Sequence, residues 1–196
     1  NVIIPHFLEG GEKAYEVINE IKEGELILLD KQIAGIKGNY GAVYENFEKD
    51  IFFVFLEALP KLSNYHTLKL VFPSYTYFPD EILKGFEHFC IEYAFQYKIV
   101  HKIEDEPITE GDVFVNMMED DLLVLLDKIQ ATHLQVGKNI GIISYNETPW
   151  KRFLIDGITT ISTDFKKMGV LAAQMVLNNE RKHIEVPFSL TMRKSL

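Results

Sequence analysis

The sequence predicts an α/β protein built on parallel, doubly wound sheets. Short apolar, β-branched segments alternate with segments of helical period along the whole chain, and this alternation is typical of parallel sheets covered by helices. The run 140–143 is apolar and stops at a polar loop, as expected of a buried parallel strand. Open α/β sheets bind ligands beyond the carboxyl ends of their strands, so such loops are candidate ligand sites.

Apolar periodicity, with Gly, Pro, Asn and Asp as terminators, delimits each element. In chain order, strands are expected over residues 2–4, 26–29, 67–72, 98–103, 112–115, 140–144, 158–162 and 184–191. Helices are expected over residues 10–24, 38–59, 80–97, 120–130 and 165–177. Helical spacing is seen in Ala14, Val17, Ile18 and Ile21, in Val43, Phe47, Ile51, Val54 and Phe55, and in Ile82, Leu83, Phe86 and Phe89. Gly24 and Pro60 end the first two helices, and Asp80 is expected to cap the third.

Composition restricts the class of protein. With 196 residues, 47% of them hydrophobic, the chain can bury an ordinary core. A single cysteine, Cys90, excludes a disulfide framework and fits a reducing cytosol, where it serves as a small buried hydrophobe. A net charge of −9 argues against direct nucleic-acid contact. There is neither a membrane-length apolar run nor a signal peptide, so we expect a cytoplasmic protein.

Catalytic motifs are absent from the sequence. The six histidines are scattered without a metal-binding spacing, and there is no Gly-x-Ser-x-Gly elbow, P-loop or Gly-x-Gly-x-x-Gly loop. The acidic runs 104–106 and 119–121 are the best candidates for a divalent-ion site, although a solvated acidic surface explains them as well. We therefore expect a protein that is not an enzyme and has no metal or other cofactor.

Two segments near the C-terminus carry a family resemblance. Ser144-Tyr-Asn-Glu-Thr-Pro149, followed by Gly157-Ile-Thr-Thr-Ile-Ser-Thr-Asp-Phe165, resembles the signature of LacI/GalR-type effector domains. The sequence of these two segments is similar to that of sugar-responsive effector domains fused to GntR-type winged-helix repressors, the arabinose- and fucose-type regulators. The resemblance implies a two-lobed, type I periplasmic-binding-protein-like fold with parallel sheets. It assigns residues 1–62 and 163–181 to the first lobe, and 66–158 and 184–196 to the second.

The same resemblance implies the function. The chain is expected to be the effector-binding and dimerisation domain of a bacterial regulator that senses a neutral monosaccharide such as L-fucose or L-arabinose. Because the chain lacks an initial Met and opens on a strand, we expect a fragment without the N-terminal part of the first lobe and without the DNA-binding domain. DNA would be contacted only through that domain, by a homodimer. The alternative is a periplasmic sugar-binding protein that feeds a transporter.

Candidate ligand residues lie mainly at strand ends. Asn146 stands where the family carries an Asp or Asn that binds two sugar hydroxyls, and its amide offers both a donor and an acceptor. An Asx turn at the strand exit is the competing explanation. Asp30 matches a strand-end acid of the first lobe, or is a surface acid. By resemblance, Thr163 corresponds to a hinge residue, Met168 to an apolar cleft residue, and His6 to a ligand-contacting loop.

The remaining candidates are aromatic and acidic. Tyr75 and Tyr77 lie in the run 74–78 after a strand, where rings beside hydroxyl groups suit the C–H face of a sugar. Packing over the lobe's own core is the alternative explanation. Asp120 lies in the acidic run 119–121, from which one carboxylate is expected to reach the ligand. Favourable interaction with the helix dipole explains that run equally well.

Overall fold

The computed structural model describes residues 1–7, 13–74 and 77–196, which divide into two compact units. Unit 1 comprises residues 1–46 and 163–188, and unit 2 comprises 47–162 and 189–196. The chain therefore changes unit after residues 46, 162 and 188. In this division the segment 47–62 lies in unit 2, where it packs against the helix at 81–92, whereas the resemblance assigned it to the first lobe.

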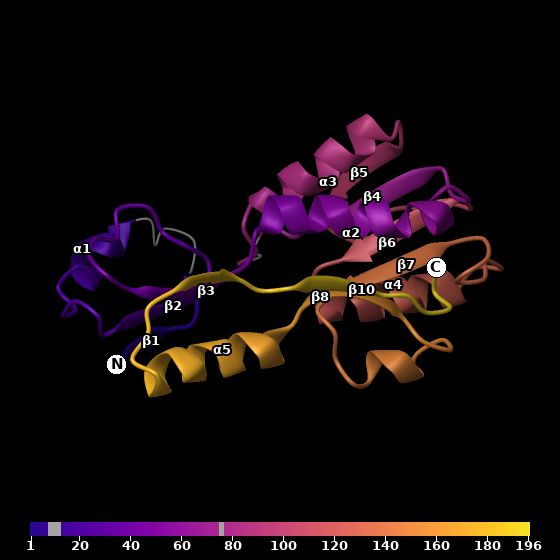
Figure 1. Cartoon of the computed structure of the whole chain (residues 1–196). Helices are drawn as coiled ribbons and strands as arrows, with labels where there is room; N and C mark the ends of the chain where they lie inside the picture. Colours follow the sequence, from indigo (N-terminus) through magenta and orange to yellow (C-terminus); the bar gives the residue numbers. More distant parts are fainter. Residues whose placement is uncertain (8–12, 75–76) are drawn as a thin grey trace. The chain divides into compact units, whose positions relative to one another are not determined.

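Unit 1 is a parallel sheet with a helix on each face (Figure 1). Its strands, in sheet order, are β1 (Val2–Ile4), β2 (Leu26–Asp30), β3 (Gly41–Tyr44) and β9 (His183–Glu185). Its helices are α1 (Tyr15–Ile18) and α5 (Phe165–Leu177). Successive side chains of a strand point to opposite faces, so Leu28 packs with Ile18 of α1 while Ile27 packs with Met168 and Met175 of α5.

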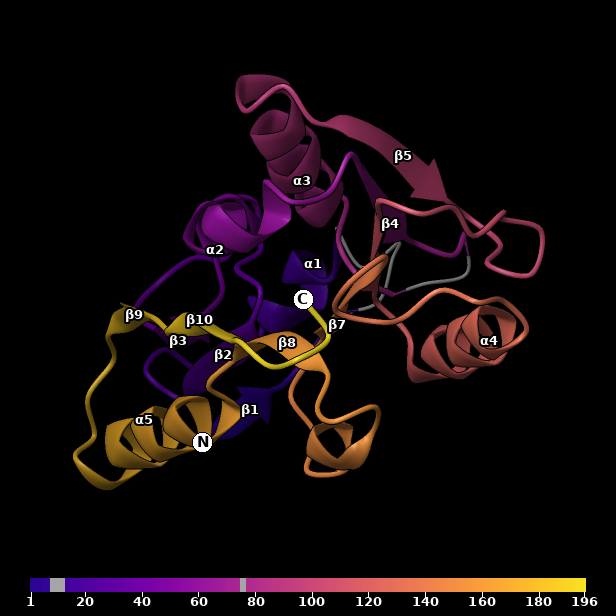
Figure 2. The same ribbon diagram turned by 90° about the vertical axis from the view of Figure 1, so that its right-hand side faces the viewer.

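Unit 2 is built on the second sheet, whose strand order is β10-β8-β7-β6-β4-β5. The strands are β4 (Thr67–Val71), β5 (Gln96–Val100), β6 (Asp112–Asn116), β7 (Gly141–Tyr145), β8 (Thr159–Thr163) and β10 (Phe188–Thr191). The helices are α2 (Phe47–Leu62), α3 (Glu81–Glu92) and α4 (Glu119–Gln130), and a 3-10 turn, η2, covers Lys151–Phe153. Figure 2 shows α2 and α3 on one side of β4 and β7, and α4 on the other.

Several expected elements differ in the structure. Gly41–Tyr44, expected at the start of a helix, is the strand β3, because Ala42 and Val43 are fully buried and paired between β2 and β9. The third helix ends at Glu92, and Asp80 makes no side-chain capping bond. The expected strand 184–191 is two strands in different sheets, because Val186 and Pro187 separate β9 from β10. The first helix is short, and residues 10–12 of its expected span lie outside the described residues.

The register of the second sheet decides where its polar residues lie. Strands β4, β6, β7 and β8 are parallel, so their carboxyl ends lie at one edge of the sheet. At this edge Asn116 of β6 is in register with Val71 of β4 and Ser144 of β7.

Within the described residues, no helix combines the length and apolarity that a membrane crossing requires.

Candidate functional site

Asn146 is the first residue after β7 and forms a tight turn at the carboxyl edge of unit 2. Its φ angle is 62°, in the left-handed region that asparagine tolerates better than most residues. Its backbone N–H donates to the Ile161 carbonyl at 2.8 Å, and its own carbonyl accepts from Lys151 Nζ at 2.7 Å. Within the described part of the chain, its side-chain Oδ1 is buried without a hydrogen-bond partner. The turn therefore engages the backbone and leaves the amide oxygen for a further donor.

Lys151 lies beneath this turn and is completely buried. Its ammonium group donates to the carbonyl oxygens of Tyr145 and Asn146 and lies 3.7 Å from Glu119 Oε1, at the start of α4. Burial lowers the pKa of Lys151, against the opposing effect of nearby carboxylates. In the sequence this residue is one of two adjacent cations in a polar loop, and no local signal marks it as buried.

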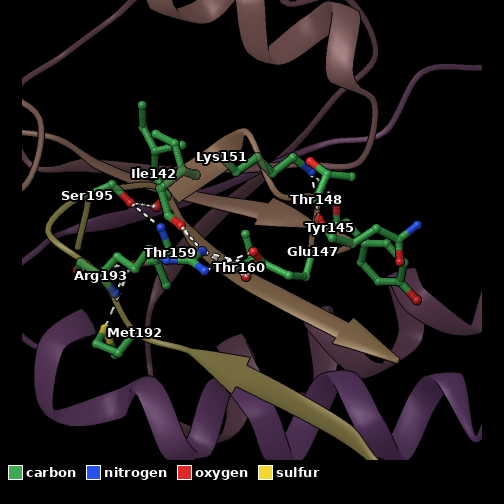
Figure 3. A network of polar contacts seen from close by, with 12 residues as sticks. Ile142, Tyr145, Glu147, Thr148, Lys151, Thr159, Thr160, Met192, Arg193 and Ser195 are labelled. Atoms are coloured by element: carbon green, nitrogen blue, oxygen red, sulfur yellow. Dashed lines mark hydrogen bonds and ion pairs between the residues drawn. The ribbon is translucent and has the colours of Figure 1, made fainter. Parts of the chain in front are cut away.

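Glu147, the next residue of the turn, joins it to the C-terminal segment (Figure 3). Its carboxylate accepts two hydrogen bonds of 2.9 Å from Arg193 and one from the Thr160 hydroxyl. Partial burial alone would raise the pKa of Glu147, but these bonds and the positive charges of Arg193 and Lys151 outweigh burial and lower it. Ser195 completes the attachment of the segment, since its hydroxyl donates to the Ile142 carbonyl at 2.6 Å and accepts from the Thr159 N–H at 2.7 Å.

Aromatic rings lie beside the turn. The ring of Phe78 meets that of Tyr145 edge to face at 4.9 Å between centroids, and Tyr77 packs on Phe78 at 4.6 Å. Tyr145 is buried, whereas Tyr77 is about half exposed. Tyr77 is thus placed by the structure near the carboxyl end of β7, as part of a ring cluster, while Tyr75 lies outside the described residues.

The acidic run at the start of α4 is arranged differently from the expectation. Asp120 is exposed, and its neighbour Asp121 is the buried acid. Burial, and then the charges of Glu104 and Asp120, raise the pKa of Asp121, whose Oδ2 has no hydrogen-bond partner within the described residues. Asn116, at the end of β6, is fully buried, and neither its amide nitrogen nor its oxygen finds a partner there. Sequence reasoning missed Asn116 because it ended this strand one residue earlier.

Unit 1 brings two predicted residues together. His6, which follows β1, and Asp30, the last residue of β2, lie 2.6 Å apart between Nδ1 and Oδ2. Asp30 has a φ of 70°, so the strand ends in a left-handed residue there too. Thr163 is buried at the end of β8, and the following Asp164 caps α5 by accepting from Lys167 N–H. Met168 packs in the core of unit 1 with Ile27, and this packing accounts for it.

Metal binding has little support in the geometry. Among residues 1–7, 13–74 and 77–196, no cluster of three or more His, Cys, Asp or Glu side chains is placed to hold a metal ion. The acidic runs 104–106 and 119–121 do not form such a cluster either. The strand edge of unit 2 offers amide, carboxylate and aromatic groups, and that of unit 1 offers an imidazole and a carboxylate.

Comparison with known proteins identifies the fold. No protein-family model matches the chain, and no curated protein does. Solved structures do match: a LacI family transcriptional regulator from Lactobacillus casei with bound glucose has a TM-score of 0.74 at 14% identity, over 100% of this chain and 78% of that one. The Escherichia coli transcriptional repressor ascG also gives 0.74, at 10% identity, over 99% and 77%. The fold is that of the LacI-family regulators.

A third structure with this fold is described both as a periplasmic binding protein and as a LacI transcriptional regulator. It is a periplasmic binding protein/LacI transcriptional regulator from Alkaliphilus metalliredigens in complex with D-xylulofuranose. It has a TM-score of 0.64 at 12% identity and covers 87% of this chain and 70% of that one. The expected periplasmic-binding-protein-like α/β fold with parallel sheets is therefore confirmed.

Proposed function

We propose that the chain binds a small, neutral sugar and acts as the effector-binding part of a bacterial transcriptional regulator. The observation that carries this proposal is Asn146, whose buried Oδ1 has no partner among the described residues while both of its backbone groups are engaged. A buried amide oxygen without a donor costs about 1–3 kcal/mol, and a sugar hydroxyl would remove that cost. Two proteins of the same fold were solved with a sugar, glucose in one and D-xylulofuranose in the other.

The charges at the site favour a neutral ligand. The Lys151 ammonium is buried and engaged by two carbonyl groups, and Arg193 is paired with Glu147. The acids Glu119 and Asp120 add negative charge at the start of α4. Because both of these cations already have partners, the phosphate of a sugar phosphate would be repelled by the nearby carboxylates, and its binding is disfavoured. Hydroxyl groups, in contrast, can donate to carboxylates and to the Asn146 amide.

Unit 1, considered by itself, also carries polar side chains at its strand ends. The imidazole of His6 and the carboxylate of Asp30 form a pair whose side chains are 37% and 19% exposed. Such a pair can donate to and accept from hydroxyl groups, so it supports sugar binding by unit 1 as well. Thr163 and Tyr77 remain additional candidate contacts.

The finer features of the proposal rest on the sequence resemblance. They are an effector of the L-arabinose or L-fucose type, a GntR-type winged-helix domain outside this chain as the only part that touches DNA, a homodimer and a cytoplasmic location. Two of the solved structures named above are described as LacI-type proteins and none as a GntR-type protein, so they lend no support to the GntR subgroup. The second candidate function is a periplasmic sugar-binding protein, which the fold shared with the A. metalliredigens protein favours.

Titration calorimetry with a panel of pentoses, hexoses, deoxyhexoses and their phosphates tests the proposal. We expect binding of at least one neutral sugar and of no sugar phosphate. Asn146→Gly should weaken binding by about 1–3 kcal/mol, since glycine keeps the left-handed backbone and removes the amide. Asn179→Gly is the matched control, because Asn179 is an exposed left-handed asparagine in unit 1 with φ 52°. Equal affinity for Asn146→Gly and the parent would remove Asn146 from the site.

A second experiment separates the regulator from the transport protein. The full-length protein, as encoded by its gene, is titrated with operator DNA in band-shift experiments, with and without the sugar identified by calorimetry. A regulator should show an operator affinity that changes with the sugar. A product with a secretion signal and no DNA binding would instead establish the periplasmic alternative.

A further inference from the structure

The burial of Lys151 is the starting observation. Its side chain is fully buried at the beginning of η2, and its backbone is held as well, by the Thr148 carbonyl at 3.1 Å and the Ile158 N–H at 3.0 Å. Burying an ammonium group is costly unless hydrogen-bond acceptors surround it. Here the acceptors are the Tyr145 and Asn146 carbonyl oxygens, at 2.9 Å and 2.7 Å from Nζ.

These two carbonyl groups explain why the turn needs a cation. They belong to consecutive residues and converge on one point because Asn146 is left-handed. Two carbonyl dipoles aimed at the same point repel each other. An ammonium group carries three donors and no acceptor, so it satisfies both carbonyl groups at once. With the Asn146 N–H bound to the Ile161 carbonyl, the peptide groups on both sides of Asn146 are fixed.

Lys151 also connects the turn with the neighbouring strand exit. Its Nζ lies 3.7 Å from Glu119 Oε1, and the Thr148 hydroxyl donates to the same carboxylate oxygen at 3.3 Å. Glu119 is the first residue of α4, which follows β6. The residues after β7 and the first turn of α4 are thus held in one arrangement by a single buried cation and an acid.

We propose that Lys151 is a positioning residue for the effector-binding turn Tyr145–Glu147, acting through the backbone of Asn146 rather than by touching the ligand. This inference rests on the proposed sugar-binding function. Without the ammonium group the two carbonyl groups lose this shared donor, and the turn relieves the repulsion between them by rotating its peptide groups toward water. The Asn146 amide then leaves the position in which it meets a sugar hydroxyl.

The test compares Lys151→Met with Arg152→Met. The two variants lose the same charge at adjacent positions, but Arg152 is exposed, with its guanidinium over the Phe153 ring. Sugar affinity is measured by calorimetry, and local order by hydrogen exchange of the backbone amides. For Lys151→Met we expect at least about a tenfold loss of sugar affinity, the loss expected when buried carbonyl groups lose a hydrogen-bond donor. We also expect faster hydrogen exchange that is confined to residues 145–148. Arg152→Met should leave both unchanged.

Each outcome decides between the alternatives. A parent protein that binds sugar, together with an equally tight Lys151→Met variant, overturns the inference. So does faster exchange spread evenly over β4, β6 and α4, because that is the result of a merely structural role. If the parent binds no sugar, the proposed function fails, and exchange at 145–148 alone decides whether Lys151 holds the turn. If Lys151→Met does not fold, Lys151→Gln, which keeps two N–H donors, is measured in the same way and should show a smaller loss of protection in the same residues.

Discussion

Glu147 and Arg193 face each other through two N···O contacts of 2.9 Å, and this pair attaches the turn after β7 to the segment after β10. The two residues are 46 positions apart in the sequence. Arg193 also donates to the Ile158 carbonyl at 2.7 Å, so its guanidinium joins the residues that precede β8 to the turn that follows β7. A fork-shaped donor opposite a carboxylate fixes orientation as well as distance.

Glu147→Gln should lower the free energy of unfolding, because it removes the negative charge from the Glu147–Arg193 ion pair. The loss should be only about 1 kcal/mol, because the pair is partly exposed. The control is Asp156→Asn, which removes an acid 3.7 Å from Lys194 where both side chains are more than three-quarters exposed, and it should change nothing measurable. The pKa of Glu147 is lowered in the folded protein, so its contribution is present above the ordinary carboxyl pKa and disappears as the pH falls through the lowered value. Urea denaturation across this range measures both effects.

Gly85→Ala should destabilise unit 2 by about 2–3 kcal/mol or more. A Cβ atom at this position of α3 would lie 2.3 Å from the Glu48 carbonyl oxygen of α2, so the two helices would have to separate. Gly169→Ala is the matched change in α5, where a Cβ meets nothing within 4 Å, and it should stabilise by up to about 1 kcal/mol through helix propensity. Equal effects of the two substitutions in urea denaturation would contradict the close helix contact.

Glu106→Gln should cost roughly 3 kcal/mol of stability. The Glu106 carboxylate accepts from buried Lys69 at 2.8 Å and from Lys98 at 2.6 Å, and its loss leaves the Lys69 charge less compensated. Lys98→Met, at a residue whose side chain is 54% exposed, should cost less than about 1 kcal/mol.

The difference in stability between the parent and Glu106→Gln depends on pH, and this dependence follows from the pKa of Glu106. Burial alone would raise that pKa, but the bonds and charges of Lys69 and Lys98 lower it overall. The stabilisation is therefore complete above the ordinary carboxyl pKa and is lost as the pH falls through the lowered one. The free energies of unfolding of the parent and of Glu106→Gln should converge at acidic pH. A difference in these free energies that does not change with pH would argue against an ionised Glu106.

Asp121→Asn should raise stability at neutral pH by about 1 kcal/mol, because an uncharged amide replaces a buried carboxylate oxygen without a hydrogen-bond partner in the described residues. Since burial raises the pKa of Asp121, the cost of its charge is present at neutral pH and falls away as the pH drops below the raised value. Thermal unfolding at several pH values measures this. Asp120→Asn, at the adjacent exposed acid, is the control and should leave stability nearly unchanged.

Local patterns in the sequence were sufficient for the strands that carry the site. The run 140–143 is apolar and ends in a turn-forming asparagine, so both β7 and the position of Asn146 could be predicted. The helix α5 was predicted with its observed bounds, because its apolar period and the capping Asp164 are local signals. Asp30 was predicted as a strand-end acid and His6 as part of a ligand-contacting loop, but their contact required the parallel pairing of β1 and β2.

The tertiary structure alone decided the elements without a local signal. Gly41–Tyr44 is a strand because β2 and β9 lie on either side of it, and its own residues are equally compatible with a helix. The same holds for burial: Lys151 and Arg152 are adjacent cations in a polar loop, yet one is enclosed and the other exposed. Periodicity and turn residues encode local conformation, whereas the burial of Lys151 depends on two carbonyl groups and a carboxylate that only the folded chain brings to one point.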